Sequence, residues 1–202
     1  RPEWTSQPPG WLDAEVVGRP GHFWAQYWEK GWQSILYGSP DSYLDDIIAA
    51  GFDGVLLARV DAYEYFGERP AAQKEMVELV AEMANYARTI GGKPDFIVLA
   101  HNGERLSPYP EFTSAVTGIV REAVYYGYEA EDRPTPPEVT RFLERQLDPW
   151  LAIGKPVLTL DYATELRKVS SAYQRARSRG YVPFCTSRDL TQLVLNPGYE
   201  PD

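Results

Sequence analysis

Strand-like and helix-like segments alternate along most of this chain of 202 residues. Short apolar runs that end in polar residues are typical of buried strands, and longer segments with apolar residues three and four positions apart are typical of amphipathic helices. This alternation predicts a parallel sheet, because each helix carries the chain back to the start of the next strand. The expected strands are residues 53–58, 95–103, 118–127, 155–163 and 181–187, with a short candidate at 23–28, and the expected helices are residues 39–51, 70–90, 135–154 and 164–180.

The residues at the ends of these helices predict where each begins and ends. Ser39 or Asp41 is expected to cap the first helix and Gly51 to end it, while Thr135 should open the third and Gly180 should end the fourth. The clearest helix, residues 70–90, has a proline at its start and a Gly-Gly pair after it. Three segments have weaker patterns: a short helix at 110–118, a closing helical turn at 188–195 and a loop at 1–22.

Each expected strand of the sheet brings a polar side chain close to its carboxyl end. Asp61 lies just past the first of them, and the others carry Asn102, Glu122, Asp161 and Ser187. Functional groups at the carboxyl ends of successive parallel strands are typical of a (β/α)8 TIM barrel, which is the fold class we expect. A doubly wound sheet is the alternative, but it usually carries a G-x-G-x-x-G fingerprint, and none follows a strand here.

About six strands are too few to close such a barrel. An open barrel would expose two long sheet edges, so we expect that roughly two βα units precede Arg1 in a longer protein. Residues 1–202 would then be a single barrel domain that is incomplete at its N-terminal side. A smaller, open α/β sheet is the alternative.

The composition limits the classes of partner. The formal net charge is −9, so no basic surface is expected that could bind nucleic acid, whereas a cationic substrate would suit an acidic protein. A single cysteine, Cys185, excludes an intrachain disulfide, and two histidines, His22 and His101, are too few for a zinc motif. No calcium-loop motif and no membrane-spanning apolar run are present, and we expect no cofactor or metal. Six Trp and fourteen Tyr suit either core packing or stacking on sugar rings.

Five motifs resemble glycoside hydrolase family 114, the endo-α-1,4-polygalactosaminidase-like TIM barrels. They are "YW…GWQSIL…IIAAGFDGVLL–RVDAYEYF", where the dash stands at position 58, "HNGE", "VREAVYYG", "KPVLTLDYA" and "ARSRGYVPFCTSRDL", in this order, and the resemblance covers nearly all of the chain. It implies a secreted or periplasmic enzyme that cuts partly deacetylated α-1,4-linked N-acetylgalactosamine polymers, which are cationic. The start of the chain, Arg1-Pro2-Glu3-Trp4, is similar to a family loop that follows two strands, which agrees with missing N-terminal units.

Glycoside hydrolysis uses two carboxyl groups that flank the scissile bond. The resemblance places the first at the end of the "GFDGVLLA" strand, where the family typically has Asp and this chain has Ala58. The second matches Glu122, which we expect to act as general acid/base, with Tyr125 and Tyr126 providing surroundings that raise its pKa. The alternative for Glu122 is a solvated residue paired with Arg121.

Several further residues are candidates for substrate binding. Asp61 could bind an amino or hydroxyl group, or it could cap the next turn or pair with Arg59. Asp161, a carboxylate that follows a buried run, could bind substrate or support the residues that do. Asn102 suits a sugar hydroxyl, although "HNG" is also an ordinary turn. The aromatic candidates for stacking, for each of which core packing is the alternative, are Tyr27, Trp28, Tyr63 and Tyr125.

Two functions are compatible with these residues. The first is an endo-acting glycoside hydrolase, inactive in this form because Ala58 stands where the family has Asp, whether by engineering or by nature. The second is a non-catalytic barrel that binds carbohydrate and has lost a carboxylate. Position 58 separates them, because restoring the carboxylate should restore turnover only in the first case.

Overall fold

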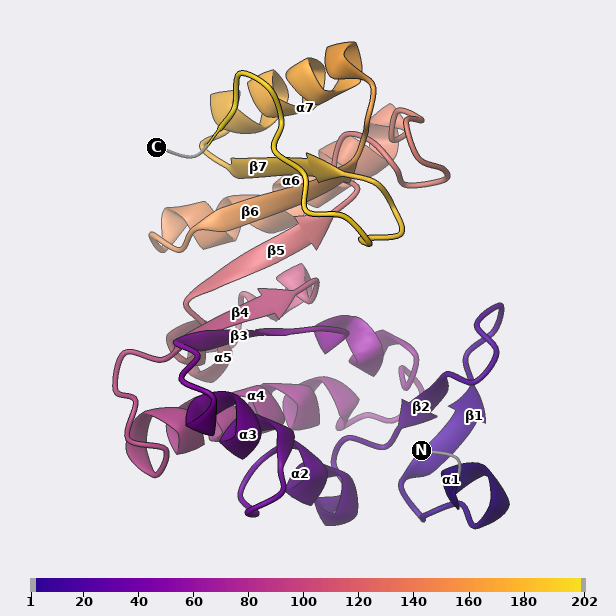
Figure 1. The fold of residues 1–202 in the computed structure, drawn as a ribbon, viewed down its shortest axis with the longest axis vertical. Coiled ribbons are helices and arrows are strands. Elements are labelled where there is room, and N and C mark those ends of the chain that lie inside the picture. The colour runs from indigo at the N-terminus through magenta and orange to yellow at the C-terminus, as the bar shows by residue number, and fades with distance from the viewer. Residues whose placement is uncertain (1–2, 201–202) are drawn as a thin grey trace. The chain divides into compact units, whose positions relative to one another are not determined.

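A computed structural model describes residues 3–200 of the chain, so Arg1 and Pro2 of the family-like N-terminal loop lie outside the described residues (Figure 1). The elements follow the predicted order of strands and helices. The helices are α1 (Glu3–Ser6), α2 (Lys30–Leu36), α3 (Tyr43–Ala49), α4 (Ala72–Thr89), α5 (Pro110–Ala115), α6 (Pro137–Ala152) and α7 (Leu166–Ser178), with short 3₁₀ turns η1 (Val60–Glu64) and η2 (Glu104–Leu106). The strands are β1 (Leu12–Glu15), β2 (Phe23–Ala25), β3 (Gly54–Leu57), β4 (Ile97–His101), β5 (Gly118–Glu122), β6 (Val157–Tyr162) and β7 (Val182–Thr186).

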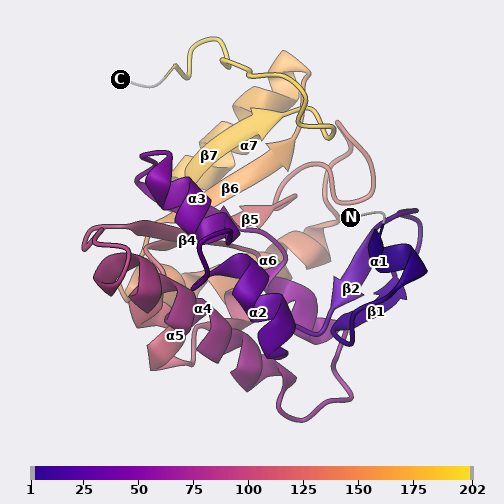
Figure 2. The same cartoon turned by 60° about the horizontal axis from the view of Figure 1, so that its bottom comes forward.

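The chain divides into two compact units. Unit 1 contains residues up to 56 together with 60–98 and 109–116, and unit 2 contains residues 57–59, 99–108 and those from 117 onward. In unit 1, β1 and β2 form an antiparallel pair whose register shifts between Leu12 and Glu15. The pair lies beside α1 in Figure 2. The amide of Ile97, at the start of β4, donates to the backbone oxygen of Asp53, next to β3. Gly54 is required at this approach, because a Cβ there would lie 2.5 Å from the backbone oxygen of Ile97.

Unit 2 is built on parallel strands. The strand order is β3-β4-β5-β6-β7, and the end of β4, β5, β6 and β7 pair in parallel within this unit. The predicted α/β class and parallel sheet are therefore confirmed. The order has two ends, β3 and β7, so the five strands of the described chain do not close into a barrel.

The strands of unit 2 have two different faces. Register places Glu122 beside Leu160 and Leu160 beside Phe184, so these side chains share one face, which we call the open face. The alternate residues point to the other face, which we call the helix-covered face. Figure 1 shows the helices α6 and α7 along these strands. On the helix-covered face Ile119, Asp161 and Cys185 are fully buried, whereas Phe184 on the open face is 39% exposed.

Several local predictions were wrong. Residues 23–28 do not add a sixth parallel strand, since β2 pairs antiparallel with β1, and the segment 1–22 contains α1 and β1 rather than only loop. The segment 188–195 forms no helical turn. The cap of α3 is Ser42, whose hydroxyl accepts from the Asp45 amide, so neither Ser39 nor Asp41 takes that place.

Other boundaries follow the sequence. Gly51 and Gly180, which follow α3 and α7, have φ values of +88° and +82°, as expected of glycines that end helices. The short helix α5 lies inside the expected segment 110–118. Thr135, by contrast, does not cap α6: its hydroxyl donates to the backbone oxygen of Ala123, and the residue before the helix, Pro136, provides no side-chain cap.

Candidate active site

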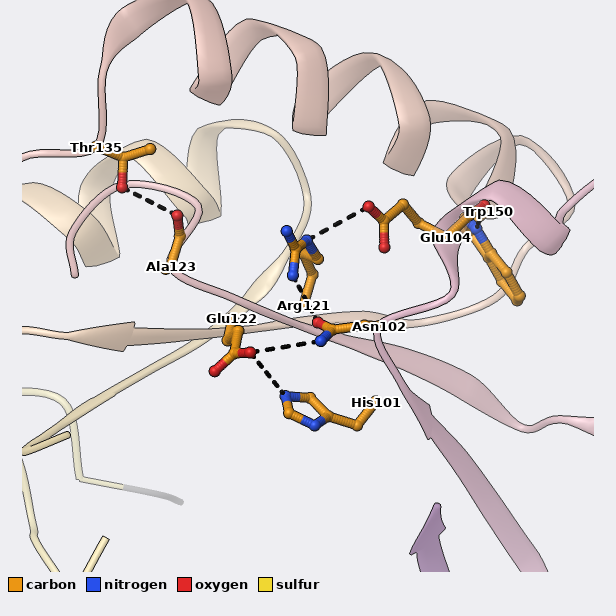
Figure 3. Close-up of polar contacts among 8 residues, drawn as sticks. All are labelled: His101, Asn102, Glu104, Arg121, Glu122, Ala123, Thr135 and Trp150. Atoms are coloured by element: carbon orange, nitrogen blue, oxygen red, sulfur yellow. Dashed lines mark hydrogen bonds and ion pairs between the residues drawn. The ribbon is translucent and has the colours of Figure 1, made fainter. Parts of the chain in front are cut away.

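Glu122 is the last residue of β5, and its side chain lies on the open face of unit 2 (Figure 3). The Tyr162 hydroxyl donates to Oε2, and the Asn102 side-chain amide donates to Oε1 over 3.4 Å. His101 Nε2 lies 4.0 Å from the same Oε1. These three neighbours come from the carboxyl ends of β4 and β6, on either side of β5, which is the arrangement expected where parallel strands end together.

The surroundings of Glu122 hold it as a carboxylate. Burial alone would raise the pKa of Glu122, but the Tyr162 hydroxyl, His101, the Asn102 amide and Arg121 together lower it below its usual range. The prediction that Tyr125 and Tyr126 raise this pKa is therefore wrong. Tyr125 is fully buried and its hydroxyl donates to Glu144 over 3.2 Å, so its ring is not accessible for stacking in this structure.

Arg121 lies on the helix-covered face and does not pair with Glu122. Its Nε is 3.4 Å from Glu104 Oε1, and its Nη1 donates to Asn102 Oδ1 over 2.6 Å. Asn102, proposed from sequence as a sugar ligand, therefore contacts both Arg121 and Glu122 in this structure. It adopts a left-handed backbone conformation, with φ of +62°, as Asn does more readily than most residues.

Asp161 lies on the helix-covered face and is fully buried. Its Oδ1 accepts hydrogen bonds from the backbone amides of Tyr125 and Tyr126, over 2.6 and 2.8 Å. Burial raises the pKa of Asp161 to about 6, against the lowering effect of these two amides. In this structure Asp161 thus holds the turn that follows Glu122, and a direct contact with substrate stays a prediction.

Ala58 directly follows β3 and is exposed. The Cβ direction of Gly54 meets the Ile97 side chain, so alternation along β3 and β4 assigns position 58 to the face that carries His101. One strand, β4, separates the strand of Ala58 from that of Glu122 in the sheet order. Ala58 lies in the turn after the strand, so we expect, as an extension of this alternation, that a carboxylate at position 58 points to the same face as Glu122.

The remaining candidates belong to unit 1 or to the core. Asp61 lies in η1 of unit 1. Tyr27 and Tyr63 are buried, and the Tyr27 hydroxyl donates to the backbone oxygen of Ala72, so neither ring is accessible for stacking in this structure. The ring of Trp28, also in unit 1, is covered by the Arg69 guanidinium at 4.2 Å from its centre.

Two residues that contact Glu122 were not predicted from the sequence. They are His101 and Tyr162. Both occur in the quoted motifs, "HNGE" and "KPVLTLDYA", directly beside residues that were selected. The signal that could have found Tyr162 is strand alternation: if Glu122 faces the open side, the in-register partner Leu160 and then Tyr162 face it too.

Within residues 3–200, no group of three or more His, Cys, Asp or Glu side chains is placed so that it could hold a metal ion. None of the helices in this described part is long and apolar enough to cross a membrane.

Two curated proteins are similar over 96% of the chain. An uncharacterized protein of Deinococcus radiodurans is 36% identical over 193 residues, and one of Methanocaldococcus jannaschii is 32% identical over 209 residues. The chain covers 60% and 58% of these two proteins, so it spans about three fifths of the curated relatives it matches.

A similar fold occurs in solved structures. The glycoside hydrolase domain of PelA from Pseudomonas aeruginosa matches with a TM-score of 0.75 at 17% identity, covering 96% of this chain and 76% of that one. A glutamate-to-alanine variant of the same domain matches with a TM-score of 0.73. Residues 1–200 also match the sequence model of glycoside-hydrolase family GH114. Because that match extends along nearly the whole chain, the protein belongs to this family.

Proposed function

We propose that this chain carries the site of a glycoside hydrolase, with Glu122 as its proton-transferring carboxyl group. The observation that carries the proposal is the position of Glu122 at the carboxyl end of a parallel strand, on the open face, with donors from both neighbouring strands. Membership of a glycoside hydrolase family supports the same reaction class.

The state of Glu122 defines what it can do in the chain as it stands. A lowered pKa keeps the side chain ionised near neutral pH, so Glu122 can accept a proton but has none to donate. A second carboxylate on the same face would raise the pKa of Glu122, because two like charges at close range oppose each other's ionisation. An acid/base role for Glu122 thus depends on that second group.

Position 58 is where we propose that the second group belongs. In a parallel sheet, strands with one strand between them lie about 10 Å apart, so carboxyl groups at the ends of such strands can reach the separation of roughly 5 to 9.5 Å that glycosidases use. With Ala58 the chain has no carboxylate at this position, so we propose that it releases little or no product.

We propose that the substrate is an α-1,4-linked galactosamine or N-acetylgalactosamine polysaccharide, cut internally outside the cytoplasm. The formal net charge of −9 supports a cationic, partly deacetylated polymer, which an acidic protein attracts. The second candidate function is a non-catalytic carbohydrate-binding barrel. It is favoured by one observation, the alanine at position 58.

The deciding experiment restores the carboxylate in the full-length protein. Ala58→Asp is compared with Ala58→Asn, which has nearly the same shape but no charge, by the reducing ends released from partly deacetylated galactosaminogalactan. We expect Ala58→Asp to exceed Ala58→Asn by about 10²- to 10⁴-fold, the usual contribution of a positioned acid or base, and Glu122→Gln to abolish the gain. Equal, background-level release by both variants would exclude the proposed hydrolase, and polymer binding without release would favour the binding barrel.

A further inference from the structure

A chain of polar contacts extends from the helix-covered face to Glu122 (Figure 3). Glu104 Oε1 is 3.4 Å from Arg121 Nε, Arg121 Nη1 donates to Asn102 Oδ1 over 2.6 Å, and Asn102 Nδ2 donates to Glu122 Oε1 over 3.4 Å. Asn102 and Glu104 are only 5% and 7% exposed. Nothing in the proposed reaction requires Arg121 or Glu104 to contact a sugar, so this series of polar contacts needs a different explanation.

Hydrogen-bond chemistry fixes the orientation of the Asn102 side chain. A guanidinium only donates and an ionised carboxylate only accepts, whereas an amide has one donating and one accepting end. With Arg121 on one side and Glu122 on the other, a single orientation satisfies both, the one in which Oδ1 faces Arg121 and NH₂ faces Glu122. The reverse orientation would oppose two donors on one side and two acceptors on the other.

The backbone places Asn102 where it can connect the two faces. It directly follows β4 in the left-handed conformation, and its amide donates to the backbone oxygen of Val120 over 2.8 Å. Arg121 and Glu122 are successive residues of β5, so alternation sends the guanidinium to the helix-covered face and the carboxylate to the open face. Asn102 lies at the end of the neighbouring strand and reaches both.

Glu104 holds the other end of the chain of contacts. Its backbone oxygen accepts from the indole NH of Trp150 in α6 over 3.0 Å, which fixes η2 against that helix. The Glu104–Arg121 pair is largely buried, and such a pair adds little net stability, because desolvation offsets the attraction. Its position behind the site is better explained by what it orients.

We propose that Arg121 and Glu104 are positioning residues that orient the Asn102 amide toward Glu122 and thereby fix the rotamer and ionisation of that carboxylate. This inference rests on the proposed function of Glu122. The titratable and charged groups that act on Glu122 among the described residues are His101 from β4 and Tyr162 from β6, which share its face, and Arg121 from β5, which lies on the opposite face. His101 and Tyr162 act directly on the carboxylate, whereas Arg121 acts mainly through Asn102.

The test measures Glu122 itself and needs no turnover, so it is independent of whether the polymer is a substrate. Carbon-13 in the glutamate side-chain carboxyls gives a titration curve for Glu122, identified as the signal that Glu122→Gln removes. Nitrogen-15 spectra follow the exchange of the two Asn102 side-chain amide protons. The variants are Arg121→Gln and Arg121→Lys, and the matched control is Arg105→Gln, whose guanidinium lies over the Phe142 ring.

Both Arg121 variants should raise the titration midpoint of Glu122 and speed exchange of the Asn102 amide protons about five- to tenfold, the equivalent of one lost hydrogen bond. Arg105→Gln should change neither. A midpoint that rises in Arg121→Gln but not in Arg121→Lys would show that only charge matters and would overturn the positioning role, as would no change in either variant. Should the variants fail to fold, fast exchange of the Asn102 amide protons in the unaltered protein would overturn it as well.

Discussion

The buried carboxyl of Asp161 should contribute a stability that falls as the pH rises, which is the reverse of the usual behaviour of an aspartate. In the folded protein burial raises its pKa to about 6, from an ordinary value of 3.8. Between these two values the folded state binds more protons than the unfolded state, so stability falls with increasing pH. The contribution of Asp161 to the free energy of unfolding is fully present below about pH 4, is lost as the pH rises through about 6, and changes no further above that.

The size of the effect follows from the difference between the two values. A separation of about two pKa units corresponds to about 3 kcal/mol, at 1.36 kcal/mol per unit. No reduction for solvent screening applies, because Asp161 is fully buried. Asp161→Asn carries no charge at any pH and keeps an oxygen that can accept from the Tyr125 and Tyr126 amides. The free energy of unfolding of the unaltered protein minus that of Asp161→Asn should therefore fall by about 3 kcal/mol between about pH 4 and pH 7.

Urea titrations across this pH range provide the assay, with hydrogen exchange over residues 119–127 as a readout for unit 2 alone. The protein is kept at micromolar concentration to limit association, because its pI of about 4.8, where the net charge is close to zero, lies inside this pH range. Asp132→Asn is the control with the opposite expected sign. Burial acts to raise the pKa of Asp132, but hydrogen bonds from Thr164 and Glu165 lower it. The free energy of unfolding of the unaltered protein minus that of Asp132→Asn should therefore rise with pH. If the free energy of unfolding of the unaltered protein minus that of Asp161→Asn stays constant or rises with pH, the inference is refuted that hydrogen bonds fail to offset the cost of burying the Asp161 charge.

Three further substitutions test the packing around the site and in unit 1. Gly127→Ala should cost about 1–3 kcal/mol in urea unfolding, because φ is +99° there and a Cβ would lie 2.5 Å from that of Tyr162; unchanged stability would contradict this contact. Ser42→Ala should lower stability by about 1 kcal/mol in thermal unfolding, since the Asp45 amide loses its cap, and a fall no larger than measurement error would argue against it. Trp150→Ala should cost about 3–5 kcal/mol because the ring is fully buried, and a loss below 1 kcal/mol would show that this core position is loosely packed.

The sequence predicted the parallel strands well because each is a short apolar run with a clear stop. Residues 118–127 and 155–163 contain β5 and β6, and the glycines at 51 and 180 end helices as expected. The failures lie where local signals are weak. The segment 1–22 is rich in Pro and Gly, and its strand β1 is defined by pairing with β2 rather than by an apolar pattern of its own. The expected turn at 188–195 had apolar residues at helical spacing, but Leu193 is 96% exposed and has no core to pack against.

The candidate site was only partly predictable. Glu122 could be selected because a charged residue ends an apolar strand, and Asn102 because polar groups at neighbouring strand ends converge. The sign of the Glu122 pKa shift could not be found in this way. It depends on which side chains contact the carboxylate across strands, and the nearest aromatics in sequence, Tyr125 and Tyr126, are not those that do so. The donor that matters, Tyr162, lies 40 positions along the chain.

The difference between Glu122 and Asp161 shows how much a single step of strand register decides. Both are carboxylates at the ends of neighbouring parallel strands, and their sequence contexts look alike. Register pairs Glu122 with Leu160, so Asp161 is one residue out of step and points to the opposite face. There it meets backbone amides and no solvent, and burial raises its pKa, whereas Glu122 meets a hydroxyl, an amide and an imidazole that keep it ionised. The same chemical group thus becomes a support for a turn on one face and a candidate catalyst on the other, because alternation along β5 and β6 assigns them to different surroundings.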